Sequence, residues 1–166
     1  TNGLTPAERG TAHHLAVQYM DFDRCGAGEG VSAELARLRE RQILSDAQAD
    51  AVDEARLVRF FASGLAMRMR KGRDIRKEFK FSLLCPADRF FPGAPRGERI
   101  LLQGVADLMF EEPEGLVVVD FKTDRVRPGE EGEAAERYRP QLETYGYALA
   151  RILKKNVKEC VLYFFE

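Results

Sequence analysis

Cysteine is scarce in this sequence of 166 residues, and the three that occur, Cys25, Cys85 and Cys160, lie far apart. No Cys-x-x-Cys pair is present, so the sequence does not support a zinc ribbon or a cysteine-bound cluster. Free, reduced thiols are typical of proteins in a reducing compartment. The cysteines therefore favour a cytoplasmic protein without disulfides.

Long apolar runs and a strong net charge are absent as well. No stretch approaches the roughly 20 apolar residues of a membrane span, and no signal-peptide pattern opens the chain. The formal net charge is −1, so a nucleic-acid ligand would need a local basic patch. The length and the 45% hydrophobic content fit one compact domain. The missing initiator Met and the strand-like last residues predict a fragment of a longer protein.

Helix signals occupy the first part of the chain, and strand signals follow. Thr5-Pro6-Ala7-Glu8 and the pair Ser45 and Gln48 are capping boxes, each of which predicts a helix start. Beyond Gly72 the hydrophobic period changes from helical to alternating. The strand–helix–strand ending favours a parallel crossover. The predicted elements are helices at 5–22, 31–42, 45–63, 65–71 and 134–155, a loop at 23–30, and strands at 75–84, 99–110, 116–122 and 160–165.

The predicted strand 116–122 ends with two opposite charges, Asp120 and Lys122. Side chains alternate along a strand, so these two residues share one face. The preceding predicted strand carries Asp107, and a polar segment of hairpin length separates the two strands. We therefore expect antiparallel pairing that brings Asp107 close to Asp120.

Two carboxylates in such proximity indicate a cation site. Like charges within a few ångströms repel each other, and one carboxylate would normally take up a proton. A divalent cation removes this cost, and Mg²⁺ or Mn²⁺ prefers such hard oxygen ligands. A neighbouring lysine can orient a water molecule or balance charge on a phosphate. On these residues alone, a purely structural Asp–Lys pair remains the alternative.

Other residues can complete or support this site. Gln141 and Tyr145 are four apart in a predicted helix and share a face. His13 and His14 point about 100° apart on theirs, so at most one can serve a given site. Glu78 offers a further carboxylate for a metal ion or a bridging water. Each also has an ordinary alternative: an exposed amide, a core tyrosine, a surface histidine or a cross-strand ion pair.

A local basic patch lies in residues 56–80, which contain nine Lys or Arg and only two acidic residues. Such a patch suits a phosphate backbone, although a solvated helix face would explain it too. The dense part of the patch consists of Arg68, Arg70, Lys71, Arg73, Arg76 and Lys77.

Five short motifs occur in a fixed order: GTAHH, KEFKF, QGVADLMF, VVDFKTD and QLETY. With this order, the sequence resembles the RecB-type nuclease domains of the PD-(D/E)xK superfamily, above all those of AddA-type helicase/nuclease subunits. The resemblance extends from Gly3 to Phe165. It implies an α/β, restriction-endonuclease-like fold in which helices flank a mixed central sheet. Residues 1–72 would form a helical lead-in and residues 73–166 the α/β core of one nuclease domain.

The resemblance also implies roles for individual residues, since Gly10 and His14 match the G-x-x-x-H pattern of these nucleases. The implied catalytic residues are Asp107, Asp120, Lys122, Gln141 and Tyr145. The implied metal ligands are His14, Asp107 and Asp120, with Glu78 and the backbone carbonyl of Phe121 as further candidates.

The implied activity is hydrolysis of phosphodiester bonds in single-stranded DNA with Mg²⁺, leaving 5′-phosphate and 3′-hydroxyl ends. Mn²⁺ or Ca²⁺ could bind in place of Mg²⁺. The implied setting is bacterial double-strand break repair and recombination, with a helicase domain in the same chain and a partner of the AddB type.

Two absences limit this interpretation. No Walker A sequence is present, so ATP would act only through a helicase domain outside this sequence. Three scattered cysteines cannot supply the four that hold an iron–sulfur cluster in some RecB-type nucleases. Two alternatives remain: a catalytically silent DNA-binding or scaffolding module of the same fold, and a stand-alone or phage RecB-like nuclease.

Overall fold

Two capping boxes start helices at the predicted positions. In the computed structural model, which describes residues 3–165, they precede α1 (Pro6–Tyr19) and α3 (Asp46–Ala51). The Thr5 hydroxyl accepts the N–H of Glu8 at 3.2 Å, and the N–H of Thr5 donates to the Glu8 carboxylate at 2.7 Å. Ser45 and Gln48 make the same reciprocal pair. The outermost residues of the predicted domain, 1, 2 and 166, lie outside the described part.

Helix α2 (Gly28–Glu40) begins earlier than predicted, inside the segment expected to be a loop. The short 3₁₀ helix η1 (Phe22–Arg24) precedes it. Gly30 lies in the first turn of α2, where a Cβ atom would be 1.7 Å from the carbonyl oxygen of Arg24. The glycine is thus needed for close backbone approach at a helix start, rather than for a flexible loop.

The described chain divides into two compact units that each combine distant segments. The helical unit holds residues 3–73, 121–126 and 163–165, and the sheet unit holds residues 74–120 and 127–162. The chain first passes from the helical unit to the sheet unit between residues 73 and 74. No sequence pattern indicated that the chain returns to the helical unit twice.

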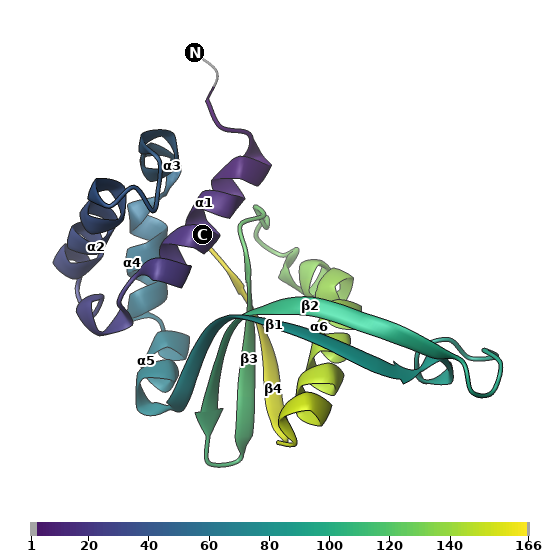
Figure 1. Ribbon diagram of the computed structural model, residues 1–166. Helices are drawn as coiled ribbons and strands as arrows, with labels where there is room; N and C mark the ends of the chain where they lie inside the picture. Colours follow the sequence, from purple (N-terminus) through teal and green to yellow (C-terminus); the bar gives the residue numbers. More distant parts are fainter. Residues whose placement is uncertain (1–2, 166) are drawn as a thin grey trace. The chain divides into compact units, whose positions relative to one another are not determined.

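The helical unit contains five α-helices among its described residues, with α4 (Glu54–Ala62) at its core (Figure 1). The buried residues Leu57, Phe60 and Phe61 recur at helical spacing and give α4 one apolar face. The ring of Phe60 lies 5.1 Å from that of Phe121 and 5.0 Å from that of Tyr163. The ends of two strands therefore pack on α4, and α5 (Gly64–Lys71) follows it.

Four strands form one sheet in the order β1-β2-β3-β4: β1 (Arg73–Pro86), β2 (Arg99–Glu112), β3 (Gly115–Lys122) and β4 (Val157–Phe164). Strands β2 and β3 are antiparallel, and Glu112 faces Gly115. The turn therefore consists of two residues and is tighter than predicted. The N–H of Leu116 donates to Asn156 O at 2.8 Å, and that of Phe165 to Lys122 O at 2.9 Å. Residue numbers increase in the same direction along both strands, so β3 and β4 are parallel. The sheet is therefore mixed, as predicted.

Helix α6 (Glu131–Leu153) makes the crossover between β3 and β4 and lies along the strands of the sheet unit (Figure 1). The 3₁₀ helix η2 (Ala87–Arg89) follows β1. Ala148 and Leu149 of α6 pack in one buried cluster with Met109 of β2 and Val118 of β3. None of the helices in residues 3–165 is both long enough and apolar enough to cross a membrane.

Candidate active site

Asp107 and Asp120 are cross-strand neighbours in the sheet unit. Leu108 of β2 faces Val119 of β3, and the two aspartates are the next residues on these antiparallel strands. Directly opposite residues have Cβ atoms about 4.5–5.5 Å apart on the same face of the sheet. Asp120 is 6% exposed, whereas Asp107 is half-buried. The hairpin geometry expected from the sequence is therefore present, with a tighter turn.

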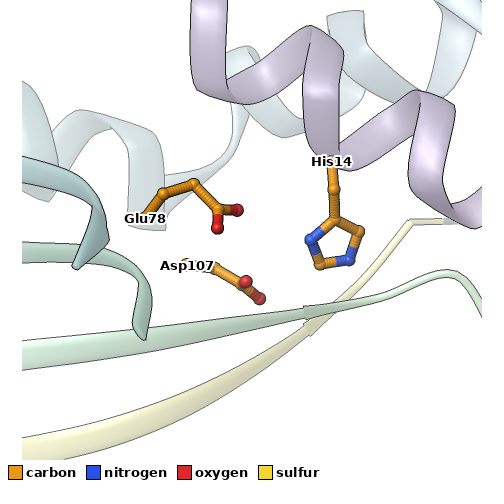
Figure 2. A group of neighbouring side chains, drawn as sticks. All are labelled: His14, Glu78 and Asp107. Carbon is orange, nitrogen blue, oxygen red and sulfur yellow. The ribbon is translucent and has the colours of Figure 1, made fainter. Parts of the chain in front are cut away.

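A third carboxylate, from β1, joins this group. The carboxylate oxygens of Glu78 and Asp107 lie within 4.8 Å of one another, and both side chains are half-buried. Figure 2 shows the two carboxylates side by side, drawn with His14 of the helical unit. Glu78 and Asp107 thus bring two acidic side chains together from neighbouring strands, and Asp120 lies on the next strand of the sheet.

Glu78 has an unusual backbone conformation. Its φ is 47°, in the left-handed region, although it lies within a strand. A non-glycine residue pays a steric cost there of roughly 1–2 kcal/mol. Such residues mark bulges that redirect a side chain, and they gather at functional sites. No sequence pattern in KEFKF indicated this conformation.

The last residues of β3 belong to the helical unit, where His14 is found. The ring of His14 meets that of Phe121 edge to face, with centroids 6.4 Å apart. Phe121 is buried and stands between Asp120 and Lys122 in the chain. Lys122 is half-buried and shares a strand face with Asp120 by alternation. His14 is therefore packed against the residue that separates the predicted catalytic pair.

His13, the neighbour of His14, has a structural role. Its Nδ1–H donates to Arg9 O at 2.8 Å, and its Nε2 accepts the N–H of Asp53 at 2.9 Å. The side chain is 3% exposed, and burial lowers the pKa of His13 below its ordinary value. Both ring nitrogens are thus occupied in the neutral form, which leaves His14 as the histidine able to serve a site.

Gln141 and Tyr145 share a face of α6, as predicted. The amide Nε2 of Gln141 donates to the Tyr145 hydroxyl at 3.2 Å. The Tyr145 ring meets Phe81 edge to face at 5.0 Å. Gly104 of β2 lies under both rings, and a Cβ atom there would be 2.7 Å from Phe81 and 2.8 Å from Tyr145. Gly104, in the motif QGVAD, is a supporting residue that sequence reasoning missed.

The six predicted DNA-binding residues do not all have the same surroundings. Arg70 donates from Nη2 to the carbonyl of Phe61 at 2.8 Å, which ties α5 to the end of α4. The guanidinium of Arg76 lies 5.6 Å from the ring centroid of Phe79 on β1. Lys71 and Arg73 are exposed, whereas Arg68 and Lys77 are half-buried. Their role in binding DNA stays a prediction.

The donor set at the strands fits a hard divalent cation. Carboxylate oxygens of Glu78 and Asp107 lie within 4.8 Å of one another, and Asp120 follows Val119, which pairs with Leu108 beside Asp107. Like charges at this separation favour either a shared proton or a bound cation. Carboxylate oxygens match Mg²⁺ and Mn²⁺. The cysteines are free, and burial raises the pKa of Cys160 to about 11, so thiolate ligands are not favoured.

The sequence of this chain is similar to sequences of known proteins. The chain is 40% identical over 163 residues to the A subunit of the ATP-dependent helicase/nuclease of Desulforudis audaxviator, covering 97% of this chain and 13% of that protein. It is 41% identical over 169 residues to the protein of that name from Moorella thermoacetica, covering 99% and 12%. The chain thus spans about an eighth of the length of these relatives. The family model of the PD-(D/E)XK nuclease superfamily matches residues 1–166, and the chain belongs to that superfamily.

Proposed function

We propose that this domain is a metal-dependent nuclease that hydrolyses phosphodiester bonds in DNA, preferably single-stranded. The observation that carries the proposal is the pair of carboxylates from Glu78 and Asp107, whose oxygens lie within 4.8 Å of one another on neighbouring strands, with Asp120 on the next strand of the sheet. Membership of the nuclease superfamily supports it, as do relatives named as helicase/nuclease subunits. By analogy with those relatives, the whole protein would also carry a helicase domain and act with a second protein of the AddB type in recombination.

Asp107, Asp120 and His14 would hold a Mg²⁺ ion, with Glu78 and the carbonyl of Phe121 able to contribute. When bound, the ion would polarise the scissile phosphate and lower the pKa of a coordinated water. The packing of His14 against Phe121 supports a place for its ring beside the end of β3. His13 has no part in this set, because both its ring nitrogens are hydrogen-bonded.

Lys122 would orient the attacking water through its ammonium group and balance the charge that develops on phosphate oxygens. The water oxygen attacks phosphorus, and the bond from phosphorus to the 3′ oxygen breaks. The products are a 5′-phosphate and a 3′-hydroxyl. Gln141 and Tyr145, joined by a hydrogen bond of 3.2 Å, would steady Lys122 or the DNA strand. The domain has no base-reading motif, so we expect little sequence specificity.

The test is cleavage of a single-stranded oligonucleotide with Mg²⁺ and with EDTA. Asp120→Ala and Lys122→Ala should each lower the cleavage rate on the order of 10²-fold or more, since each removes a group that acts on the reacting phosphate. Asp88→Ala, an exposed aspartate in η2, is the matched control and should cleave normally. Undiminished cleavage by either site variant would reject the assignment. Calorimetric titration with Mn²⁺ would separate a nuclease from a scaffold, which should bind no ion specifically.

A further inference from the structure

A cavity of about 820 Å³ lies within the helical unit. Three segments wall it: the α1 face that carries Arg9 and His13, the α3–α4 junction with Asp53 and Arg56, and residues 123–125 after β3. The cavity therefore begins one residue beyond Lys122 in the chain. No residue of the cavity belongs to the sheet unit.

The wall formed by residues 123–125 fits closely against α1. A Cβ atom at Gly10 would be 2.9 Å from the hydroxyl oxygen of Thr123. Real Cβ atoms essentially never come so close, so the glycine is what lets Thr123 lie against the helix. Gly10 was noted in the sequence for its spacing to His14, and the structure supplies a physical reason for it. The close contact fixes the segment from which Arg125 extends.

The charged side chains that line the cavity differ in whether they form ion pairs. Asp53 caps α4 by accepting the N–H of Arg56 at 3.3 Å, and its carboxylate pairs with Arg56 Nε at 3.3 Å. His13 is buried, neutral and hydrogen-bonded at both nitrogens. Arg9 and Arg125 are exposed, and within residues 3–165 neither forms an ion pair with a carboxylate. Asp124 is the other acid of the wall, and it has interactions of its own.

Two guanidinium groups that share a concave site favour an anion with several oxygens. Arginine presents planar N–H donors that match phosphate in a bidentate manner. A concave wall concentrates their field more than a flat surface does. The ligand that the proposed function brings to this region is the sugar–phosphate backbone of DNA.

We propose that this cavity binds a backbone phosphate of single-stranded DNA through Arg9 and Arg125. The inference rests on the proposed function, since it names a phosphate subsite for the same substrate strand. The subsite is separate from the basic residues 68–77, which lie on α5 and β1. It positions the strand and takes no part in bond breaking.

Binding without cleavage tests the subsite. Fluorescence anisotropy with a labelled single-stranded oligodeoxynucleotide in EDTA should show about tenfold weaker binding for Arg9→Gln combined with Arg125→Gln. The salt dependence of binding should also become shallower by about one phosphate contact for each arginine removed. Arg41→Gln removes the same kind of charge at the exposed end of α2, outside the cavity, and should bind almost as the wild type does.

Two outcomes would overturn the subsite: wild-type affinity in the double variant, or an equal loss in Arg41→Gln. Failure of the wild type to bind the oligonucleotide would overturn it as well. With Mg²⁺, the double variant should show a raised KM and a kcat near that of the wild type. Normal cleavage by Lys122→Ala would instead reject the proposed nuclease function, whatever the binding in EDTA, so the two failures are distinguishable.

Discussion

Gly104 shows how the absence of a side chain can position a neighbouring one, here the proposed site residue Tyr145. Because the rings of Phe81 and Tyr145 would lie within 2.9 Å of a Cβ atom there, any larger residue must displace them. Gly104→Ala should lower the free energy of unfolding by about 1–3 kcal/mol, the usual cost of overpacking, and move Tyr145. Urea unfolding with a matched control, Gly132→Ala, measures this.

Gly132 lies near the start of α6, and nothing is within 4 Å of a Cβ atom placed on it. Alanine there should stabilise the protein by roughly 0.5–1 kcal/mol, because it reduces the conformational entropy of the unfolded chain and causes no clash in the folded protein. Equal unfolding midpoints for the two alanine variants would show that Gly104 carries no packing constraint.

Individual residues differ in how far the sequence predicts them. The antiparallel pairing of the strands that carry Asp107 and Asp120 was predictable, because a hairpin turn between two strands fixes their register. Gly104 was not, since a glycine within a strand pattern does not reveal which helix residue will approach it. The backbone conformation of Glu78 could not be predicted for a similar reason: the surrounding fold imposes it, and the local sequence does not.

At the scale of elements, His13 joins α1 to the start of α4 through one ring. Its Nε2 accepts the N–H of the α4 cap, Asp53, only while the ring is neutral. Burial lowers the pKa of His13 in the folded protein below the ordinary 6.5. Between the folded and unfolded pKa values the unfolded chain therefore binds more protons than the folded one, so stability rises with pH.

The contribution of neutral His13 to stability should be complete above about pH 6.5 and should decline as the pH falls toward the pKa of His13 in the folded protein. Thermal unfolding between pH 7.5 and 5.5 measures the decline, at most about 1.4 kcal/mol per pH unit. His13→Gln should flatten the pH dependence, whereas His14→Gln should retain it. A wild-type slope in His13→Gln would show that other groups cause the acid sensitivity.

The starts of α1 and α3 were predictable, because Thr5 and Ser45 make local hydrogen bonds that depend on short spacing alone. The single helix predicted at 45–63 was wrong, since it is divided into α3 and α4, and Asp53 caps the second of them. The start of α2 was not predictable, because no side chain caps it at Ala27 and its start depends on the approach of Arg24 to Gly30. Hydrogen bonds between residues close in the chain can be predicted from the sequence, whereas the approach of Arg24 to Gly30 could not.

At the scale of the whole molecule, the helical unit depends on segments that lie far along the chain. Phe60 contacts Phe121, Tyr163 and Phe165, with ring centroids 5.1, 5.0 and 5.9 Å away. A fragment of residues 1–73 contains the five helices but none of these three rings. The buried rings of Phe121 and Phe165 contribute roughly 1.5–3 kcal/mol each, so we expect the fragment not to fold by itself.

Dispersion of amide resonances in NMR spectra and near-ultraviolet circular dichroism would report this loss, with the full chain as reference. A fragment of residues 1–126, which restores Phe121, should regain only part of the native signal. Cooperative melting of the 1–73 fragment near the wild-type temperature would contradict the dependence. Nothing in the first 73 residues indicates these partners, which is why a simple helical lead-in was the natural expectation.

The left-handed backbone of Glu78 has an evolutionary consequence. Glycine is the residue that this conformation accommodates without steric cost, and glycine has no carboxylate. Mutations that increase stability would therefore tend to replace Glu78, whereas selection for the proposed nuclease activity would retain it. Among descendants that have lost the chemistry, this position should be among the first to change, and their thermal tolerance should increase when it does.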